Sequence, residues 1–468
     1  MKPAILDLKF PFELTNDQLA AVNSWVMSGY RGSIIYSTGT GKTEIAFECA
    51  RRRACENHLH SRKCGSINTI RISNHNITNI FPSILFLVPR IILIEQNIKR
   101  LLLYGIPEKS LGAFFGERKD VKEITISTYQ SIINNLELIH NADTIIFDEM
   151  HLLTDSATTL SKMFDALNER KKEQDLRQTK ALLGLTATID EEHPNYHTIV
   201  SLLPPVKKYM INDAVQDGRL ARPILIPIKA KLTAEEKNLY SIYTKRIRKI
   251  SNELDISDPA AIAKLLRRGS TLARQASSWF ENVRKRKSLI NSAVNKISSA
   301  VELISLKHPS ERIMVFSETI ESIKILKDRL EEEKGIKSMI IESKLKSKER
   351  QLILSNWGTS FYALLSVHTL EIGYDVPQVR IAIILASTSN MNQATQRVGR
   401  ILRKSEGKYN ALIYTIYLSD THDYAHLDIV RQATQVDSKK QEINGTVEGE
   451  SKINATTRNA KLDSFMAH

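Results

Sequence analysis

The stretch SIIYSTGTGKTEIAFECA, residues 33–50, decides the fold. Its first four residues form a short apolar run that is typical of a buried strand, and residues 44–50 have the pattern of a helix. The loop between them, STGTGKT at 37–43, carries two glycines followed by Lys42 and Thr43. A strand, such a loop and a helix N-terminus direct successive backbone N–H groups and the helix dipole at a phosphate group. The stretch therefore predicts a nucleotide-binding loop.

Within this loop, Lys42 would add a positive charge beside the β/γ-phosphates and Thr43 a hydroxyl ligand for Mg²⁺. The strict pattern, G-x-x-x-x-G-K-[ST], has glycine at the position where this chain has Tyr36. The predicted nucleotide-binding residues of the loop are Ser37, Thr38, Gly39, Thr40, Gly41, Lys42 and Thr43.

A second polar group follows another predicted strand. Residues 144–147, TIIF, are apolar, and the residues DEMH at 148–151 come directly after them. Parallel sheets place ligands at the carboxyl ends of their strands. We therefore expect Asp148 to hold Mg²⁺ and Glu149 to polarise the attacking water, as carboxylates beside a metal-bound phosphate do in nucleoside triphosphate hydrolysis.

Short apolar runs separated by helical patterns recur along the chain and predict two parallel sheets covered on both faces. The predicted strands are 33–36, 84–88, 125–127, 144–147, 181–185, 312–316, 338–341, 363–367, 381–385 and 411–414. We therefore predict an α/β fold with two parallel-sheet domains joined by a basic helical element. The predicted parts are an ATP-binding domain at 1–220, the helical element at 221–309, a second α/β domain at 310–432 and a disordered, polar tail at 433–468.

The charge of the chain is uneven. Its 468 residues carry 66 Lys and Arg against 52 Asp and Glu, a formal net charge of +14. Residues 231–307 contain 16 of the basic residues and 7 of the acidic ones, and apolar residues recur there at helical spacing. The stretch therefore predicts helices with basic faces, which either follow the phosphate backbone of a nucleic acid or are simply solvated.

Composition limits the class of protein. No apolar run reaches the roughly 18 residues that a membrane span needs, and the N-terminus lacks the pattern of a signal peptide. Three cysteines are too few for a disulfide framework and fit a reducing compartment. We expect an intracellular protein, cytoplasmic or in the nucleoid, or nuclear in a eukaryote, with no membrane partner.

Eight short motifs in this order resemble those of the superfamily 2 helicases. The phosphate loop, DEMH at 148–151 and TAT at 186–188 resemble motifs I, II and III. The further matches are VP at 88–89 with Leu93 and Gln96 (motif Ia), TISTYQ at 125–130 (Ib), IMVFS at 313–317 (IV), GYDVP at 373–377 (V) and QRVGRILR at 396–403 (VI). The His in DEMH and the Gln that opens motif VI favour the DExH branch. The sequences of these motifs are most similar to those of the XPB-type and type I/III restriction-motor groups.

The resemblance covers about residues 10–420 and implies that both parallel-sheet domains are RecA-like and that the protein uses ATP and Mg²⁺. It also implies roles for residues far from the phosphate loop. Arg400 and Arg403 would act as arginine fingers on the γ-phosphate, which Gln396 would sense beside them. Gly373 and Asp375 would link the nucleotide state to the nucleic-acid track. Gln18 would contact adenine, with a solvent-exposed helix glutamine as the alternative.

The resemblance predicts a nucleic-acid-stimulated ATPase that translocates on DNA and unwinds it. An RNA helicase is the first alternative, because helicase motifs grip a sugar-phosphate backbone and the 2′-hydroxyl decides between the two. A motor subunit of a restriction or defence complex is the second, with a nuclease or specificity subunit as its partner. A non-catalytic binding module is the third, and the intact catalytic residues argue against it.

One further group remains open. Cys55, His58, His60 and Cys64 lie within ten residues, between motifs I and Ia. Two cysteines and two histidines are ligands that Zn²⁺ accepts. Their spacing fits no zinc-finger pattern, so a polar loop is the alternative.

Overall fold

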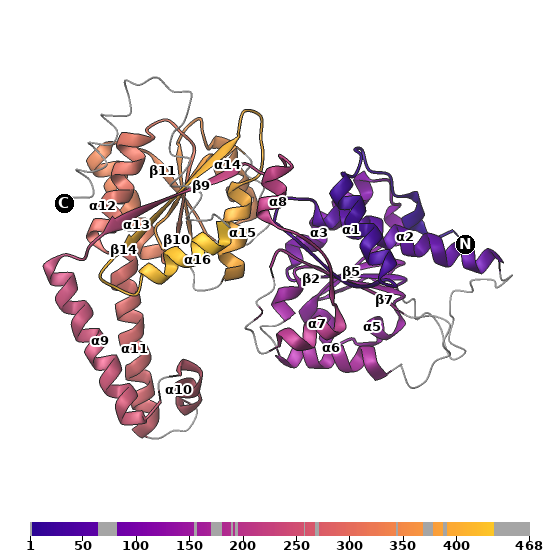
Figure 1. The fold of residues 1–468 in the computed structure, drawn as a ribbon, viewed down its shortest axis with the longest axis horizontal. Helices are drawn as coiled ribbons and strands as arrows, with labels where there is room; N and C mark the ends of the chain where they lie inside the picture. Colours follow the sequence, from indigo (N-terminus) through magenta and orange to yellow (C-terminus); the bar gives the residue numbers. More distant parts are fainter. Residues whose placement is uncertain are drawn as a thin grey trace. The chain divides into compact units, whose positions relative to one another are not determined.

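The computed structural model describes residues 2–63, 82–153, 157–169, 180–188, 191, 195–256, 258–266, 271–342, 345–367, 378–386 and 391–434. The chain divides into two compact units, Met1–Leu220 and Ala221–His468 (Figure 1). Among the described helices, none is long and apolar enough to cross a membrane.

The first unit is built on an eight-stranded sheet in the order β4-β3-β5-β2-β6-β7-β1-β8. Of the strand pairs that the described residues form in this sheet, only β3–β4 is antiparallel. The strands are β1 (Arg31–Tyr36), β2 (Ile84–Val88), β3 (Leu111–Phe115), β4 (Arg118–Lys119), β5 (Ile124–Thr128), β6 (Thr144–Phe147), β7 (Ala181–Thr186) and β8 (Pro205–Tyr209). The helices are α1 (Asn16–Met27), α2 (Lys42–Lys63), α3 (Ile91–Leu103), α4 (Tyr129–Ile133), α5 (Glu137–Asn141), α6 (Ala157–Glu169), α7 (Tyr196–Leu202) and α8 (Ile211–Gln216), with short 3₁₀ turns at Ala4–Asp7, Glu108–Ser110 and Met150–Leu153.

Helices cover both faces of this sheet, and β2 shows how the sequence encodes that arrangement. Leu85 and Leu87 belong to a core shared with residues of α4 to α7. Phe86, between them, points to the other face and meets Phe47 of α2, with ring centroids 5.7 Å apart. Because successive side chains of a strand point to opposite faces, a strand buried on both must be apolar throughout.

The second unit has a six-stranded, fully parallel sheet in the order β11-β12-β10-β13-β14-β9. Its strands are β9 (Arg222–Ala230), β10 (Ile313–Ser317), β11 (Ser338–Ile341), β12 (Ala363–Val367), β13 (Ile381–Ile384) and β14 (Asn410–Leu418). Its helices are α9 (Ala234–Leu254), α10 (Pro259–Leu265), α11 (Thr271–Asn291), α12 (Val294–Glu302), α13 (Ile320–Lys334), α14 (Ser347–Asn356), α15 (Met391–Ile401) and α16 (Tyr424–Thr434), with a π-helical turn at Leu303–Lys307. The predicted α/β class with two parallel sheets is confirmed.

Helices α9 and α11 lie side by side and project from the sheet of the second unit, with α10 near their far end (Figure 1). They have a small core of their own, separate from that of the sheet. It consists of Ile247, Ile262, Leu265, Ala276 and Trp279. The indole of Trp279 also donates a hydrogen bond to the Ser251 hydroxyl at 2.9 Å. The hairpin is therefore held together by its own packing.

The prediction of a helical element over the whole of 221–309 is wrong at both ends. Residues 222–230 form β9, which pairs with β14 along its full length, and α12 packs into the core of the second sheet. Pro223 and Pro227 obscured this strand in the sequence. β9 is outermost, and the Arg222 N–H donates to the Tyr409 carbonyl beside β14, so alternate residues, including both prolines, direct their nitrogens away from the sheet. The predicted tail at 433–468 starts two residues too early, because Ala433 and Thr434 are buried residues of α16. The rest of the predicted tail lies outside the described residues.

Candidate active site

Three neighbouring strands of the first sheet, β6, β7 and β1, end at the same edge and carry the predicted motifs there. β1 leads into the phosphate loop, β6 into Asp148 and Glu149, and β7 ends at Thr186. The sequence separates these segments by many residues, but parallel pairing of adjacent strands brings their carboxyl ends together. The predicted residues of the first unit thus converge on one site.

The phosphate loop has the conformation that its glycines allow. Gly39 and Gly41 have φ angles of 88° and 86°, in the left-handed region that favours glycine. α2 begins at Lys42, directly after the loop. The Lys42 ammonium donates to the Tyr36 carbonyl at 3.1 Å and lies 3.9 Å from a carboxylate oxygen of Glu149. The loop therefore joins a helix N-terminus, a cation and a carboxylate.

Two hydroxyl groups of this loop are buried without a hydrogen-bond partner among the described residues. They are the Ser37 Oγ and the Thr38 Oγ1, on residues that are only 2% and 8% exposed. Buried polar atoms almost always have partners, so two unpaired hydroxyls in a glycine-bearing loop fit a polar ligand. Thr40, by contrast, donates its hydroxyl to the Ser37 carbonyl at 2.7 Å. The loop thus fits a polyphosphate, whose oxygens would accept from the two hydroxyls.

Gln18 lies in the first turn of α1, against the loop, and not on an exposed face. It is 4% exposed, and its amide nitrogen donates to the Thr40 carbonyl at 3.0 Å. Its side-chain oxygen accepts from the Thr15 N–H at 2.9 Å. A Cβ added at Gly41 would collide with the Gln18 amide nitrogen. Gln18 therefore braces the phosphate loop, and its contact with adenine stays a prediction.

The two carboxylates differ in environment. Asp148 is buried, and its burial, together with the nearby charge of Glu149, raises its pKa to about 7, against the opposing effect of Lys42. Its carbonyl accepts a hydrogen bond from the Tyr129 hydroxyl at 2.6 Å. Glu149 is partly exposed and has a φ of 51°, which is uncommon for a residue with a side chain. Such strained residues cluster at functional sites.

His151 connects this acidic pair to the end of β7. Its Nδ1 lies 2.9 Å from the Thr186 hydroxyl and 3.4 Å from a Glu149 oxygen. The Thr186 hydroxyl donates to the Thr188 carbonyl at 2.7 Å. Because that hydroxyl hydrogen is used, the His151 Nδ1 must be the donor to Thr186. The motif at 148–151 and the motif at 186–188 are thus one hydrogen-bonded unit.

The donors present fit a magnesium ion bound together with a polyphosphate. Mg²⁺ prefers oxygen ligands and usually takes one or two carboxylates plus phosphate oxygens. The Asp148 carboxylate and the hydroxyl of Thr43, in the first turn of α2, are the groups predicted to hold it. Desolvation makes the ionised Asp148 unstable by itself, and a bound cation would relieve that instability.

The remaining predicted residues lie in the second unit. Gln396 and Arg400 are one helical turn apart in α15, and Arg403 follows the end of that helix. Arg400 is 8% exposed, so most of it is buried. Gly373 and Asp375 lie outside the described residues, as does the whole motif at 373–377.

The cysteine and histidine group is only partly described. Cys55 and His58 lie in α2, which continues to Lys63, so the first part of this segment is helix and not the predicted loop. Cys64 and the side chain of His60 lie outside the described residues. Among the residues that the structure does describe, no three Cys, His, Asp or Glu side chains form a metal-binding group. Zinc binding stays a prediction.

One contact of the phosphate loop was not predicted. Arg219, in the turn after α8, donates to the Thr40 carbonyl at 2.9 Å. No motif marks it, and in sequence it is 179 residues from Thr40. Only the pairing of β8 with β1 brings it to the loop.

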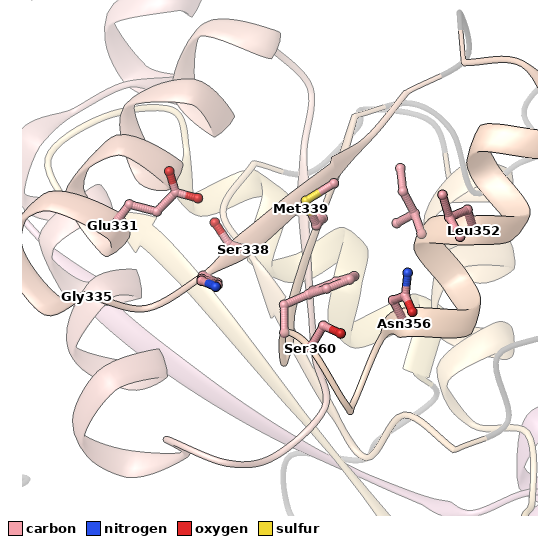
Figure 2. A pocket seen from close by; sticks show the side chains of 10 residues that line it. Glu331, Gly335, Ser338, Met339, Leu352, Asn356 and Ser360 are labelled. Carbon is pink, nitrogen blue, oxygen red and sulfur yellow. The ribbon is translucent and has the colours of Figure 1, made fainter.

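A separate hollow lies in the second unit, between the outer strand β11 and helices α13 and α14 (Figure 2). Its volume is about 620 Å³, and Met339 and Leu352 line it from β11 and α14. The Ser338 hydroxyl there is buried and has no hydrogen-bond partner among the described residues. None of the predicted site residues that the structure describes lines this hollow.

Comparisons with known proteins agree with the motifs. Residues 11–191 match the family model "Type III restriction enzyme, res subunit", and residues 295–405 match "Helicase conserved C-terminal domain". The chain belongs to the superfamily 2 helicases. Within that superfamily, it is of the XPB and restriction-motor type.

Two curated relatives align with most of this helicase. The "DNA 3′-5′ translocase XPB2" of Sulfurisphaera tokodaii is 25% identical over 427 residues, which are 89% of this chain and 84% of the relative. The "DNA 3′-5′ helicase XPB" of Mycobacterium tuberculosis is 26% identical over 421 residues, 87% of this chain. The chain spans only 60% of that second relative.

Solved structures show the same fold at lower identity. The Type ISP restriction-modification enzyme LlaBIII bound to DNA has a TM-score of 0.59 at 16% identity and covers 98% of this helicase, which spans 33% of that enzyme. The helicase domain of Pyrococcus furiosus Hef has a TM-score of 0.52 at 18% identity, covering 88% of this chain and 99% of that domain. The two sheets are therefore RecA-like helicase domains, as predicted.

Proposed function

We propose that this helicase is an ATP-driven motor that translocates on DNA and unwinds it. One observation carries the proposal. Lys42, at the start of α2, and Glu149, after the end of β6, lie 3.9 Å apart beside a glycine-bearing loop. The same loop holds two buried hydroxyls without partners among the described residues. This arrangement offers a polyphosphate a cation, hydrogen-bond donors and, next to them, a base.

Each of the site residues of the first unit has its own role in the proposed reaction. Lys42 and the backbone N–H groups of the loop bind the β/γ-phosphates. Asp148 and Thr43 would hold Mg²⁺, which neutralises charge on the phosphates when bound. Glu149 orients a water molecule and takes its proton as the water oxygen bonds to the γ-phosphorus. The bond from that phosphorus to the bridging oxygen breaks, and ADP and phosphate leave.

The second unit supplies the rest of this proposed machinery. Arg400 and Arg403 stabilise the negative charge that develops on the transferred phosphoryl group, and Gln396 senses it. An arginine of this kind contributes about 10³–10⁵ in rate in other nucleotide hydrolases. Gly373 and Asp375 are proposed to pass the nucleotide state to the DNA track. Turnover would then require residues of both units.

DNA is the proposed track for two reasons. Both curated relatives are named for action on DNA, and the restriction enzyme of the same fold was solved bound to DNA. The hairpin α9–α11 also exposes clustered cations, among them Arg246, Arg248, Arg284 and Lys285. Clustered cations bind a phosphate backbone by releasing its counterions. We place this activity inside the cell, where DNA and ATP occur together.

A motor subunit of a restriction complex is the second candidate. It is favoured by the family model that matches residues 11–191 and by the likeness to a restriction-modification enzyme. In that case a nuclease or specificity subunit would be the partner. Stable copurification with such a subunit would decide for this candidate.

The test is the ATPase rate alone and with single-stranded DNA, duplex DNA, forked DNA and RNA. Lys42→Ala serves as the blank, because it removes the cation of the loop together with its hydrogen bond to the Tyr36 carbonyl. We expect DNA to stimulate hydrolysis and forked DNA to be unwound in a strand-displacement assay. Stimulation by RNA alone, or by none of the four, would contradict the proposal.

A further inference from the structure

The carbonyl of Thr40, in the middle of the phosphate loop, accepts two hydrogen bonds from outside the loop. One comes from the amide of Gln18 at 3.0 Å and the other from the guanidinium of Arg219 at 2.9 Å. Thr40 itself is fully buried. A carbonyl oxygen has two lone pairs, so this one is fully used.

Arg219 is itself held in place by several contacts. Its other terminal nitrogen donates to the Thr15 hydroxyl at 2.9 Å and forms an ion pair with Asp17. The guanidinium carbon lies 6.0 Å from the centre of the Tyr209 ring. The side chains of Arg219 and Asp17 are 21% and 14% exposed. These contacts tie α1, the loop and the turn after α8 together within the first unit.

The hydrogen bonds to the Thr40 carbonyl have a consequence for phosphate binding. The Thr40 carbonyl and the Gly41 N–H belong to one trans peptide plane and point in opposite directions. Holding the carbonyl away from the phosphate side therefore turns the Gly41 N–H towards it. Gly41 has a φ of 86°, and glycine has many other conformations available, so the loop needs an outside contact to stay in this one.

We infer that Arg219 is a positioning residue for the nucleotide, which it serves by holding the Thr40–Gly41 peptide in its phosphate-binding orientation. The inference rests on the proposed ATPase for the identity of the ligand. Arg219 does not touch the phosphates in this role. Arg219 restricts the loop before the nucleotide binds, so the loop loses less conformational freedom on binding. Removing Arg219 should therefore lower the affinity for the nucleotide more than the rate of the chemical step.

The test compares Arg219→Ala and Arg219→Lys with the unchanged protein. Equilibrium binding of a fluorescent ADP is measured first, and KM and kcat for DNA-stimulated ATP hydrolysis second. Hydrogen bonds to charged groups contribute about 1.5–3 kcal/mol, so Arg219→Ala should weaken ADP binding roughly 10- to 100-fold. KM should rise in parallel while kcat at saturating ATP changes less than about threefold. Arg219→Lys, a single point charge that cannot bridge both partners, should fall between.

Arg118→Ala is the matched control, because Arg118 is 55% exposed in β4, the strand at the opposite edge of the sheet from β8. It should leave ADP affinity unchanged. If Arg219→Ala binds ADP and shows a KM like the unchanged protein, even with a lower melting temperature, Arg219 is merely structural and the inference is overturned. Should Arg219→Ala not fold, Arg219→Lys decides in the same way, since an unchanged KM would overturn it.

The binding arm separates this inference from the proposed function. If the unchanged protein binds ADP but hydrolyses no ATP with any nucleic acid, weaker binding by Arg219→Ala still supports the inference and only the proposed function falls. If the unchanged protein binds no ADP, both are overturned.

Discussion

Asp148→Asn should stabilise the metal-free protein at alkaline pH. Burial and the charge of Glu149 raise the pKa of Asp148 from its ordinary 3.8 to about 7. In the folded state the carboxyl therefore keeps its proton up to neutral pH, whereas in the unfolded chain it loses it in acid. Folding is coupled to this difference in bound protons.

The sign and size follow from that difference. Below about pH 4 both states hold the proton, and the favourable contribution of the neutral carboxyl is fully present. As the pH rises from the ordinary pKa of 3.8 to the folded pKa of about 7, the free energy of unfolding falls by about 1.4 kcal/mol per unit, and above the folded pKa it stays level. From pH 5 to pH 8 the loss is about 3 kcal/mol. An asparagine keeps the shape and cannot ionise, so Asp148→Asn should lose none of it.

Thermal unfolding in EDTA at pH 5 and pH 8 measures the effect. For a unit of this size, 3 kcal/mol corresponds to roughly 6–12 °C. Between pH 5 and pH 8, the melting temperature of the unchanged protein should fall by about this much relative to that of Asp148→Asn. Glu117→Gln, on an exposed residue, is the control and should follow the unchanged protein. Identical pH profiles for Asp148→Asn and the unchanged protein would refute the reasoning from burial.

Three other changes test the site, the hairpin and the second unit. Glu149→Gln should keep nucleotide binding and slow hydrolysis by about 10²–10⁴-fold, measured in single turnovers; an unchanged rate would remove Glu149 as the base. Replacing residues 284–287 by serine should lower the slope of log Kd for DNA against log salt by up to about 4 units, since each lost phosphate contact removes about 0.9; an unaltered slope would leave these cations as solvated surface. Lys296→Met should lower the free energy of unfolding by about 3–5 kcal/mol in urea titrations. It would leave the buried Asp423, 2.7 Å from the Lys296 ammonium, without its ion-pair partner; no loss of stability would contradict the buried pair.

The central strands could be predicted from the sequence, and several others could not, for a physical reason. Both faces of β2 or β10 are buried, so the whole strand must be apolar, and that signal is local. The outer strands β8 and β9 carry lysines and prolines, which protect a sheet edge from further pairing and also erase the apolar pattern. The prediction of helix at 222–230 failed for this reason.

The site shows the same division between local and spatial information. Lys42, Asp148 and Glu149 belong to contiguous motifs that follow predicted parallel strands, so the sequence predicts their presence and their place at the carboxyl edge of the sheet. Arg219 belongs to no motif, and nothing local distinguishes it from other arginines. What makes it special is the position of its turn beside the phosphate loop, which depends on β8 pairing with β1. A residue that acts through a fold contact is visible only once the fold is known.

Tyr36 shows both a local sequence signal and a contact that depends on the fold. It stands where the strict loop pattern has glycine, which weakens the motif when read from sequence alone. In the structure it is the last residue of β1, and the site uses only its carbonyl, which accepts from Lys42. Its ring stacks on Tyr209 at 5.0 Å between centroids, and its hydroxyl donates to the Asp17 carbonyl at 2.7 Å. Tyr36 thus supports two of the residues that hold Arg219, so the departure from the pattern strengthens the anchor of the loop instead of weakening its function.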